Sequence, residues 1–150
     1  PLAEEHGFLP GTEEEKMDPW LGAISDNIEA LHLHDESPKG SIEYVKERAN
    51  IQFKALNYIR GRSFQRALIL IDECQNLTPH QMKAIITRAG EGSKVICLGN
   101  LGQIDTPYLT PTSSGLTYMC ERFKGFAHGG HIQLEGSPRS VLAEYAENNL

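Results

Sequence analysis

Two carboxylates stand side by side at the end of an apolar run. Residues 67–71 read Ala-Leu-Ile-Leu-Ile, and Asp72 and Glu73 follow directly. An acid fixed at the end of a rigid strand can bind Mg²⁺, and a second acid beside it can polarise a water that attacks a phosphate. This is the Walker B arrangement. The alternative is that Asp72 only ends a strand and that Glu73 is a solvated surface residue.

A second polar segment follows the next apolar stretch. Residues 99–105 read Gly-Asn-Leu-Gly-Gln-Ile-Asp and come directly after the run at 94–98. The glycines permit close approach of the backbone to a ligand, and Gln103 can contact both a phosphate and a water. A glutamine in this place can sense the γ-phosphate and transmit its loss. The alternative is a polar loop between a strand and a helix.

Both polar segments are expected at the carboxyl ends of parallel strands. Strand-like and helix-like patterns alternate through residues 51–150, which is typical of βαβ units. The predicted strands cover residues 51–56, 67–71, 94–98 and 131–135, and the predicted helices cover 18–32, 41–49, 78–90, 113–123 and 137–146. We therefore predict an α/β fold, a three-layer α/β/α sandwich with a mostly parallel sheet. Ligands bind such sheets beyond the carboxyl ends of the strands.

Local signals support several of these elements. Thr78 and Gln81 form a capping box, and Gly90 is expected to end the helix that starts there. The run at 67–71 is apolar on both faces, which predicts a buried central strand. Ser137, followed by proline, is expected to open the last helix.

Length and composition fit one ordinary domain. The chain has 150 residues, 14 Lys and Arg against 20 Asp and Glu, and three Cys. No apolar run approaches the roughly 18 residues of a membrane helix, and three Cys without a Cys-x-x-Cys pair fit free thiols in a reducing cytoplasm. Residues 1–50 hold 12 acids and four bases, whereas residues 51–150 hold eight acids and ten bases. We expect an acidic helical segment at 1–50 and a βαβ core at 51–150.

Four short runs of residues carry a resemblance to a known family. They are Ile-Asp-Glu-Cys-Gln-Asn-Leu-Thr-Pro at 71–79, Thr-Arg-Ala-Gly-Glu-Gly-Ser-Lys-Val at 87–95, Gly-x-x-x-Gln-Ile-Asp at 99–105 and Ser-Gly-Leu at 114–116. Together they resemble the PhoH-like P-loop ATPase family. Segments within residues 7–20 and 58–63, and Arg139 with Ser140, fit the same family, so the resemblance extends over nearly all of the chain.

The resemblance implies a P-loop fold related to superfamily-1 helicases, with ATP and Mg²⁺ as ligands. Asp72 and Glu73 stand where the family has its Walker B acids, with Asp72 at the metal, and Gln103 stands at the sensor glutamine. Arg139 matches a family arginine that can contact the γ-phosphate in cis or across a subunit boundary. A fixed guanidinium suits the charge that develops there. The resemblance also implies a homo-oligomer for the parent protein.

Two departures from the family pattern bear on activity. The phosphate-binding loop Gly-x-x-x-x-Gly-Lys-Ser/Thr does not occur in the chain, although it cradles the triphosphate in this class of enzyme. The family places it upstream of Pro1, so we expect a fragment that carries the hydrolysis side of the site and binds nucleotide weakly or not at all. The second departure is Asn100, where the family has Asp. Asn100 lacks this charge, which argues against a metal or water role at this position.

Arg60, Arg62 and Arg66 form the densest basic cluster of the chain. They can contact a nucleic-acid backbone in a salt-dependent way that is largely independent of sequence. Tyr58 and Phe64 lie close in sequence and offer rings for base stacking. Single-stranded RNA is therefore a candidate partner. The alternative is that the arginines pair with acids of the N-terminal third.

Two functions stay open on the sequence alone. The first is the hydrolytic half of an ATPase that acts with RNA. The second is a non-catalytic α/β module for nucleotide sensing or protein interaction, in which Asp72 and Glu73 no longer work. Cys74 beside them is expected to fill space in the core, because no basic residue adjoins it to activate the thiol.

Overall fold

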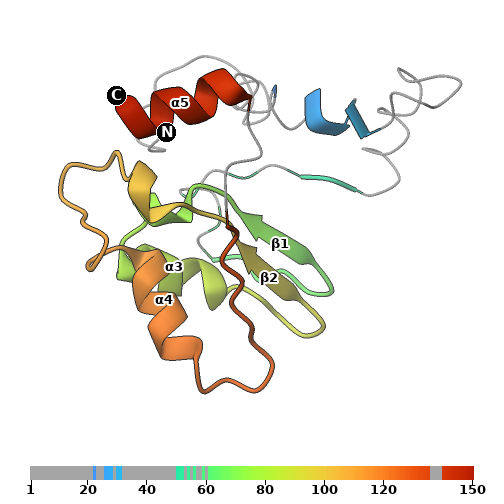
Figure 1. Ribbon diagram of the computed structural model, residues 1–150. Helices are drawn as coiled ribbons and strands as arrows, with labels where there is room; N and C mark the ends of the chain where they lie inside the picture. The colour runs from blue at the N-terminus through green and yellow to red at the C-terminus, as the bar shows by residue number, and fades with distance from the viewer. Residues whose placement is uncertain are drawn as a thin grey trace, which may run out of the picture. The chain divides into compact units, whose positions relative to one another are not determined.

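The computed structural model of the chain describes residues 61–135 and 140–150, together with residues 22, 26–28, 30, 31, 50–52, 54, 56 and 59. The chain divides into two compact units, Pro1–Ile69 with Ile85–Lys94 and Leu70–Ala84 with Val95–Leu150. Figure 1 shows the labelled elements from β1 to α5. Within the described ranges, no helix combines the length and the apolar composition that a membrane span requires.

Two parallel strands form the described sheet (Figure 1). β1 is Leu68–Ile71 and β2 is Lys94–Cys97. The Lys94 amide donates to the Ala67 carbonyl at 2.9 Å, and the Leu98 amide donates to the Ile71 carbonyl at 2.8 Å. Both hydrogen bonds join residues at the same separation in sequence, which is the register of a parallel pair. The strands predicted in these two places are confirmed.

α3, Pro79–Ile86, begins at the predicted capping box. The Thr78 amide donates to Gln81 Oε1 at 2.9 Å, and the Gln81 amide donates to Thr78 Oγ1 at 3.1 Å. These reciprocal bonds satisfy two amides that the start of a helix leaves unpaired. α3 follows β1 and precedes β2, so the predicted βαβ order is present.

α3 ends at Ile86, earlier than the predicted stop at Gly90. The Phe64 amide donates to the Arg88 carbonyl at 2.8 Å, and the Gly90 amide donates to the Phe64 carbonyl at 2.7 Å. Ala89 consequently forms a parallel bridge with Phe64. Backbone groups that pair with Phe64 cannot also continue the helix, so this long-range pairing shortens it.

α4, Gly115–Phe123, packs on the 3₁₀ helix η3, Cys74–Asn76. Ser114 caps α4, because its Oγ accepts from the Leu116 amide at 3.2 Å. The same hydroxyl donates to the Gln75 carbonyl at 2.8 Å, and Ser114 is fully buried. One side chain therefore both starts α4 and holds it against η3.

Gly115 lets two backbones approach closely at the start of α4. Its amide donates to the Leu77 carbonyl at 2.7 Å, and a Cβ on it would lie 2.7 Å from the carbonyl oxygens of Leu77 and Thr78. Gly115→Ala is expected to lower the free energy of unfolding by about 2 kcal/mol, because two backbone carbonyls must shift to make room. Chemical denaturation of the chain measures the change. Gly125→Ala is the control, since its Cβ would meet no atom within 4 Å; equal stability of the two variants would contradict the prediction.

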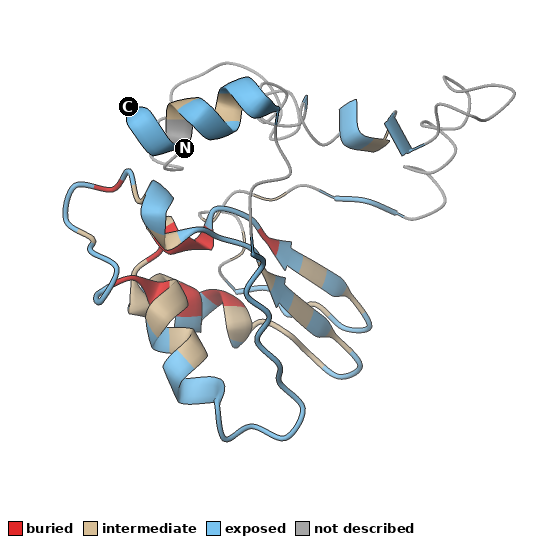
Figure 2. Ribbon diagram, in the orientation of Figure 1, coloured by how far each residue is buried: buried red, intermediate tan, exposed pale blue. Residues whose placement is uncertain are grey.

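The core of the second unit is small and partly polar. Its buried apolar side chains are Ile71, Cys74, Leu77 and Met82, and its buried polar side chains are Gln75, Thr106 and Ser114. Figure 2 shows buried residues gathered around η3 and at the start of α4. A buried polar side chain persists only where hydrogen bonds replace its lost hydration. The polar members of this core therefore indicate a hydrogen-bonded network at η3.

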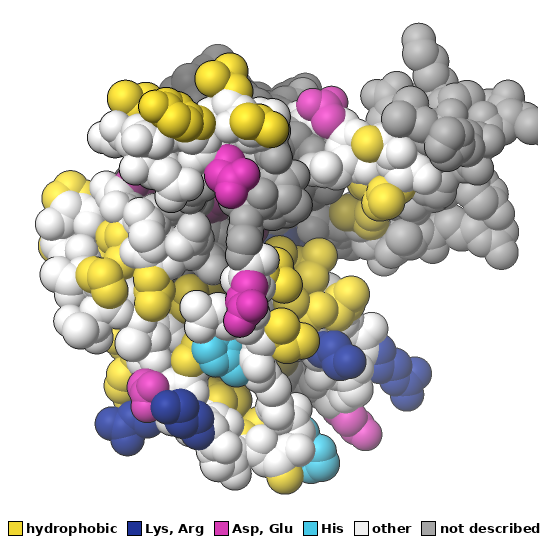
Figure 3. All heavy atoms as spheres, viewed as in Figure 1, with side chains coloured by type: hydrophobic (Ala, Val, Ile, Leu, Met, Phe, Trp, Pro, Cys, Tyr) yellow, Lys and Arg dark blue, Asp and Glu magenta, His cyan; other side chains and the backbone are white. Residues whose placement is uncertain are grey.

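One face of the sheet is exposed. Leu68 and Leu70 of β1 are 62% and 61% exposed, and Ile96 and Leu98 beside them are 38% and 48% exposed. Figure 3 shows hydrophobic side chains gathered over the strands. The expectation that residues 67–71 are buried on both faces is therefore wrong for this structure, because the described residues leave this face uncovered. We call these four residues the exposed sheet face.

Other predicted elements differ from the structure or lie outside it. Residues 131–135 are not a strand, because no described strand pairs with them, and Ile132 and Leu134 are 85% and 87% exposed. None of the described positions within 51–56 lies in a strand, whereas each described position within 18–32 is helical. The predicted helix at 41–49 lies outside the described residues.

The last helix, α5, is Val141–Asn149. Ser140 caps it, because its Oγ accepts from the Ala143 amide at 3.2 Å. The predicted start at Ser137 was too early, since the cap that forms is at Ser140. The described residues thus form an α/β fold with a two-stranded parallel sheet.

Candidate functional site

Asp72 and Glu73 lie directly after β1, at its carboxyl end. Both are exposed. Asp72 Oδ1 accepts from the Glu73 amide at 2.9 Å, which fixes the carboxylate against the backbone. Among the described residues, Asp72 Oδ2 has no hydrogen-bond partner. That oxygen is available to a ligand.

Glu73 has a left-handed backbone, with φ 52° and ψ 33°. A residue with a side chain pays about 1–2 kcal/mol in this region, and backbone strain of this kind recurs at functional sites. Two hydrogen bonds hold the conformation. Asp72 accepts from the Glu73 amide, and Gln75 Nε2 donates to Glu73 Oε2 at 2.5 Å. The carboxylate is thus held in one place while it stays open to water.

Gln75 is a site residue that the sequence analysis missed. Its side chain is 1% exposed. Its Nε2 donates to Glu73 Oε2 and to the Gln103 carbonyl, the latter at 3.3 Å, and its Oε1 accepts from the Asn100 amide at 3.2 Å. A single amide therefore joins the segments that follow both strands. The available signal was its place in the Asp-Glu-Cys-Gln run, where a polar residue follows the acids and precedes the buried Leu77.

The loop after β2 brings Gln103 to the same group of residues. The 3₁₀ helix η4, Leu101–Gln103, is capped by Asn100, whose Oδ1 accepts from the Gly102 amide at 2.9 Å. The Gln103 carbonyl is bonded to Gln75, and its side chain is exposed. Within the described ranges, the side chains of Gln103 and Glu73 make no direct hydrogen bond. An aspartate cap would accept the same bond, so Asn100 preserves the loop geometry without the charge.

Asn76 fixes the far end of this loop. Its Oδ1 accepts from the Asp105 amide at 3.0 Å, and Thr106 Oγ1 lies 3.4 Å from both side-chain and backbone oxygens of Asn76. Thr106 is 3% exposed. The chain between β2 and α4 is therefore tied to η3 at two consecutive residues, Gln75 and Asn76.

Cys74 fills space beside the acids, as expected. It is fully buried. A hydrogen bond to Cys97, followed by burial, raises the pKa of the Cys74 thiol far above its ordinary value. The Cys97 pKa is lowered, because the same hydrogen bond stabilises its thiolate. The raised pKa of Cys74 is opposite to the shift that activates a thiol, and all three cysteines are free.

Asp72 fits Mg²⁺ as one ligand among several. Over the part of the chain that the structure describes, no three His, Cys, Asp or Glu side chains are grouped so that they could hold a metal ion. Mg²⁺ is usually bound through one or two carboxylates, with substrate phosphates and waters completing the shell. A lone strand-end aspartate with a free oxygen has the chemistry for that role, and the remaining ligands must come from a phosphate and from other residues.

Of the three arginines predicted to bind RNA or the γ-phosphate, the structure describes only Arg62. Arg60 and Arg139 lie outside the described residues, so the structure places neither. Arg62 is exposed, and it makes no ion pair within the described ranges. Of the acids within residues 1–50, only Asp26 is among the described residues, so pairing of the arginines with that acidic segment stays a prediction, as does nucleic-acid binding.

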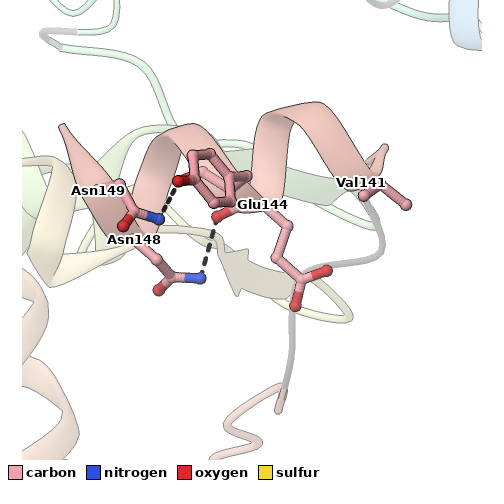
Figure 4. A pocket seen from close by; sticks show the side chains of 5 residues that line it. Val141, Glu144, Asn148 and Asn149 are labelled. Carbon is pink, nitrogen blue, oxygen red and sulfur yellow. Dashed lines mark hydrogen bonds between the residues drawn. The ribbon is translucent and has the colours of Figure 1, made fainter.

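A shallow hollow lies on α5, away from the acids in sequence. Val141, Glu144, Tyr145, Asn148 and Asn149 line it (Figure 4). Asn148 Nδ2 donates to the Glu144 carbonyl at 3.0 Å, and Asn149 Nδ2 donates to the Tyr145 carbonyl at 2.8 Å. Both amides are thus satisfied within the helix. No predicted site residue lines the hollow.

Comparison with known proteins gives consistent matches. The family described as PhoH-like protein matches residues 2–144. The chain is 44% identical over 150 residues to Protein PhoH2 of Bacillus subtilis (strain 168), which covers 100% of the chain and 34% of that protein. It is 41% identical over 132 residues to a PhoH-like protein of the same strain, covering 88% and 39%. It is 32% identical over 140 residues to Protein PhoH2 of Mycolicibacterium smegmatis, covering 93% and 31%. The chain therefore spans between 31% and 39% of the length of these relatives.

Proposed function

The chain belongs to the PhoH-like protein family, and we propose that it forms the hydrolysis side of the ATP site in a longer P-loop ATPase. One observation carries the proposal. Asp72 and Glu73 follow β1, Gln103 lies in the loop after β2, and Gln75 links the two segments through its buried amide. Acids and a sensor glutamine at neighbouring strand ends suit phosphoryl transfer to water.

Each side chain has one proposed role. Asp72 offers a carboxylate oxygen to Mg²⁺, which when bound neutralises charge on the phosphates. Glu73 orients a water and accepts its proton as the water attacks the γ-phosphate of ATP. Gln103 contacts the γ-phosphate or that water, and it transmits phosphate loss to the loop that contains it.

The rest of the P-loop fold is proposed to come from outside the described residues. The exposed sheet face is an apolar patch on a parallel sheet, and parallel sheets are normally covered on both faces. A three-layer α/β/α sandwich with an upstream phosphate-binding loop would cover it. The chain alone is then expected to bind ATP weakly or not at all.

Arg139 is proposed to contact the γ-phosphate, either in cis or from a neighbouring subunit of a homo-oligomer. Its guanidinium carries a permanent charge and offers several donors in a fixed plane. It is two residues before the start of α5, so that helix would help to position it. The three free thiols suit a reducing cytoplasm as the site of action.

Arg60 and Arg62 are proposed to bind single-stranded RNA. Replacing both by alanine is expected to weaken binding of an RNA oligonucleotide about tenfold at about 50 mM salt, with a smaller difference at about 200 mM, because each phosphate contact adds to the salt dependence. Fluorescence anisotropy measures both affinities. Replacing Arg122 and Lys124 by alanine is the control for the loss of two charges. Equal affinity of the unsubstituted and Arg60, Arg62 variants would refute this role.

Mg²⁺-dependent ATP hydrolysis tests the proposed function. The sample is a longer protein that carries the phosphate-binding loop together with this chain. Turnover that depends on Glu73 would support the proposal. A folded protein without turnover would instead favour the non-catalytic module for sensing or protein interaction.

A further inference from the structure

Gln75 is the buried polar side chain that connects the candidate site. A buried amide is costly unless its donors and its acceptor are all satisfied. Here one Nε2 hydrogen is available for Glu73 Oε2, the other for the Gln103 carbonyl, and Oε1 accepts from the Asn100 amide. All of its partners belong to the segments that follow the two strands. The hydrogen bonds of the Gln75 amide can therefore all form only while the segment after β1 and the segment after β2 keep their relative positions.

We propose that Gln75 is a positioning residue that holds the Glu73 carboxylate in register with the Gln103 loop. This inference rests on the proposed ATPase function and adds to it a route between two parts of the site. Glu73 is otherwise an exposed side chain with several rotatable bonds. The bond from Gln75, at 2.5 Å, is charge-assisted and removes much of that freedom. A shift of the loop at Gln103 would then displace the Glu73 carboxylate, because the Gln75 side-chain amide is hydrogen-bonded to both.

Gly99 supports this position of Gln75. A Cβ on Gly99 would lie 2.7 Å from Gln75 Oε1 and 3.0 Å from Cys74 Sγ. The backbone at Gly99 thus packs directly against the amide, and a methyl group there would displace it. Gly99→Ala therefore perturbs Gln75 without removing any of its hydrogen-bonding groups, which gives a second and independent way to test the proposal.

The test compares variants of the longer ATPase in steady-state hydrolysis. Gln75→Leu removes all three bonds, whereas Gln75→Glu keeps the acceptor for the Asn100 amide but loses both donors. Both are expected to lower kcat by about 10- to 100-fold, because misplacing a catalytic group by about 1 Å costs this much. The KM for ATP is expected to change little, since Gln75 is buried. Gly99→Ala is expected to lower kcat in the same way, and Gln133→Leu, at an exposed glutamine, is the matched control.

A double substitution separates positioning from simple support of the fold. If Gln75 acts through Glu73, Gln75→Leu is expected to have no further effect on kcat in a Glu73→Gln background. An unchanged kcat in both Gln75→Glu and Gly99→Ala would overturn the inference, even if Gln75→Leu fails to fold. An unsubstituted protein that hydrolyses ATP and needs Glu73 but not Gln75 would refute the inference alone. Absence of turnover in the unsubstituted protein would refute both this inference and the proposed function.

Discussion

Under the proposed ATPase function, Glu73→Gln in the longer protein is expected to reduce ATP turnover by about 10²- to 10⁴-fold while ATP binding is retained. A glutamine cannot accept a proton from the attacking water, so the general-base contribution is lost. The substitution preserves the local structure, because its side-chain oxygen can still accept from Gln75 Nε2. Single-turnover hydrolysis and the binding of a fluorescent ATP analogue measure the two effects separately.

Glu91→Gln is the matched control for Glu73→Gln. Glu91 is an exposed glutamate in the turn before β2, and its substitution removes the same charge. Its turnover should equal that of the unsubstituted protein. If Glu73→Gln kept full turnover, Glu73 would not be the base. If it lost ATP binding together with turnover, the residue would support the structure of the site instead.

Asp72→Asn is expected to lower Mg²⁺-dependent turnover by about 10²- to 10³-fold, because a metal ligand contributes several kcal/mol to phosphoryl transfer. The asparagine oxygen can still accept from the Glu73 amide, as Asp72 Oδ1 does. The variant therefore removes the charge offered to Mg²⁺ and leaves the turn intact. Turnover measured over a range of Mg²⁺ concentrations is expected to show a higher requirement for the metal.

Glu121→Gln is the control for the loss of one acid distant in sequence. Glu121 is exposed on α4 and pairs with Lys124 at 2.8 Å. Its Mg²⁺ dependence should match that of the unsubstituted protein. An Asp72→Asn protein with the same Mg²⁺ dependence would contradict a metal role for Asp72.

The elements around the acids could be predicted because their signals are local. The apolar runs of β1 and β2 and the capping box of α3 each depend on a few neighbouring residues, and the structure contains all three. The position of Asp72 and Glu73 follows from the strand before them. Local patterns were therefore sufficient to place the candidate acids at the carboxyl end of β1.

The features that sequence reasoning missed depend on contacts distant in the chain. α3 is shorter than expected because Phe64 pairs with Arg88 and Gly90. Residues 131–135 alternate in hydrophobicity like a strand, yet no described strand pairs with them. Gln75 reads as an ordinary polar residue until its bonds to Asn100 and Gln103 are seen.

The left-handed backbone conformation of Glu73 could not be predicted from the sequence, because glutamate has no preference for the left-handed region. The structural role of Asn100 could not be predicted either. The family resemblance concerns only its missing charge, whereas in the structure its side-chain oxygen caps η4. Both features are imposed by the turns that follow the strands.

We propose that this chain carries the acids of an ATP site, and that the phosphate-binding loop of that site lies upstream in the longer protein. The most direct measurement is Mg²⁺-dependent ATP hydrolysis, with and without single-stranded RNA. It compares this chain with a version extended upstream through that loop. We predict turnover only in the extended version. No turnover in either, with both shown to be folded by circular dichroism, would contradict the claim and favour a non-catalytic module.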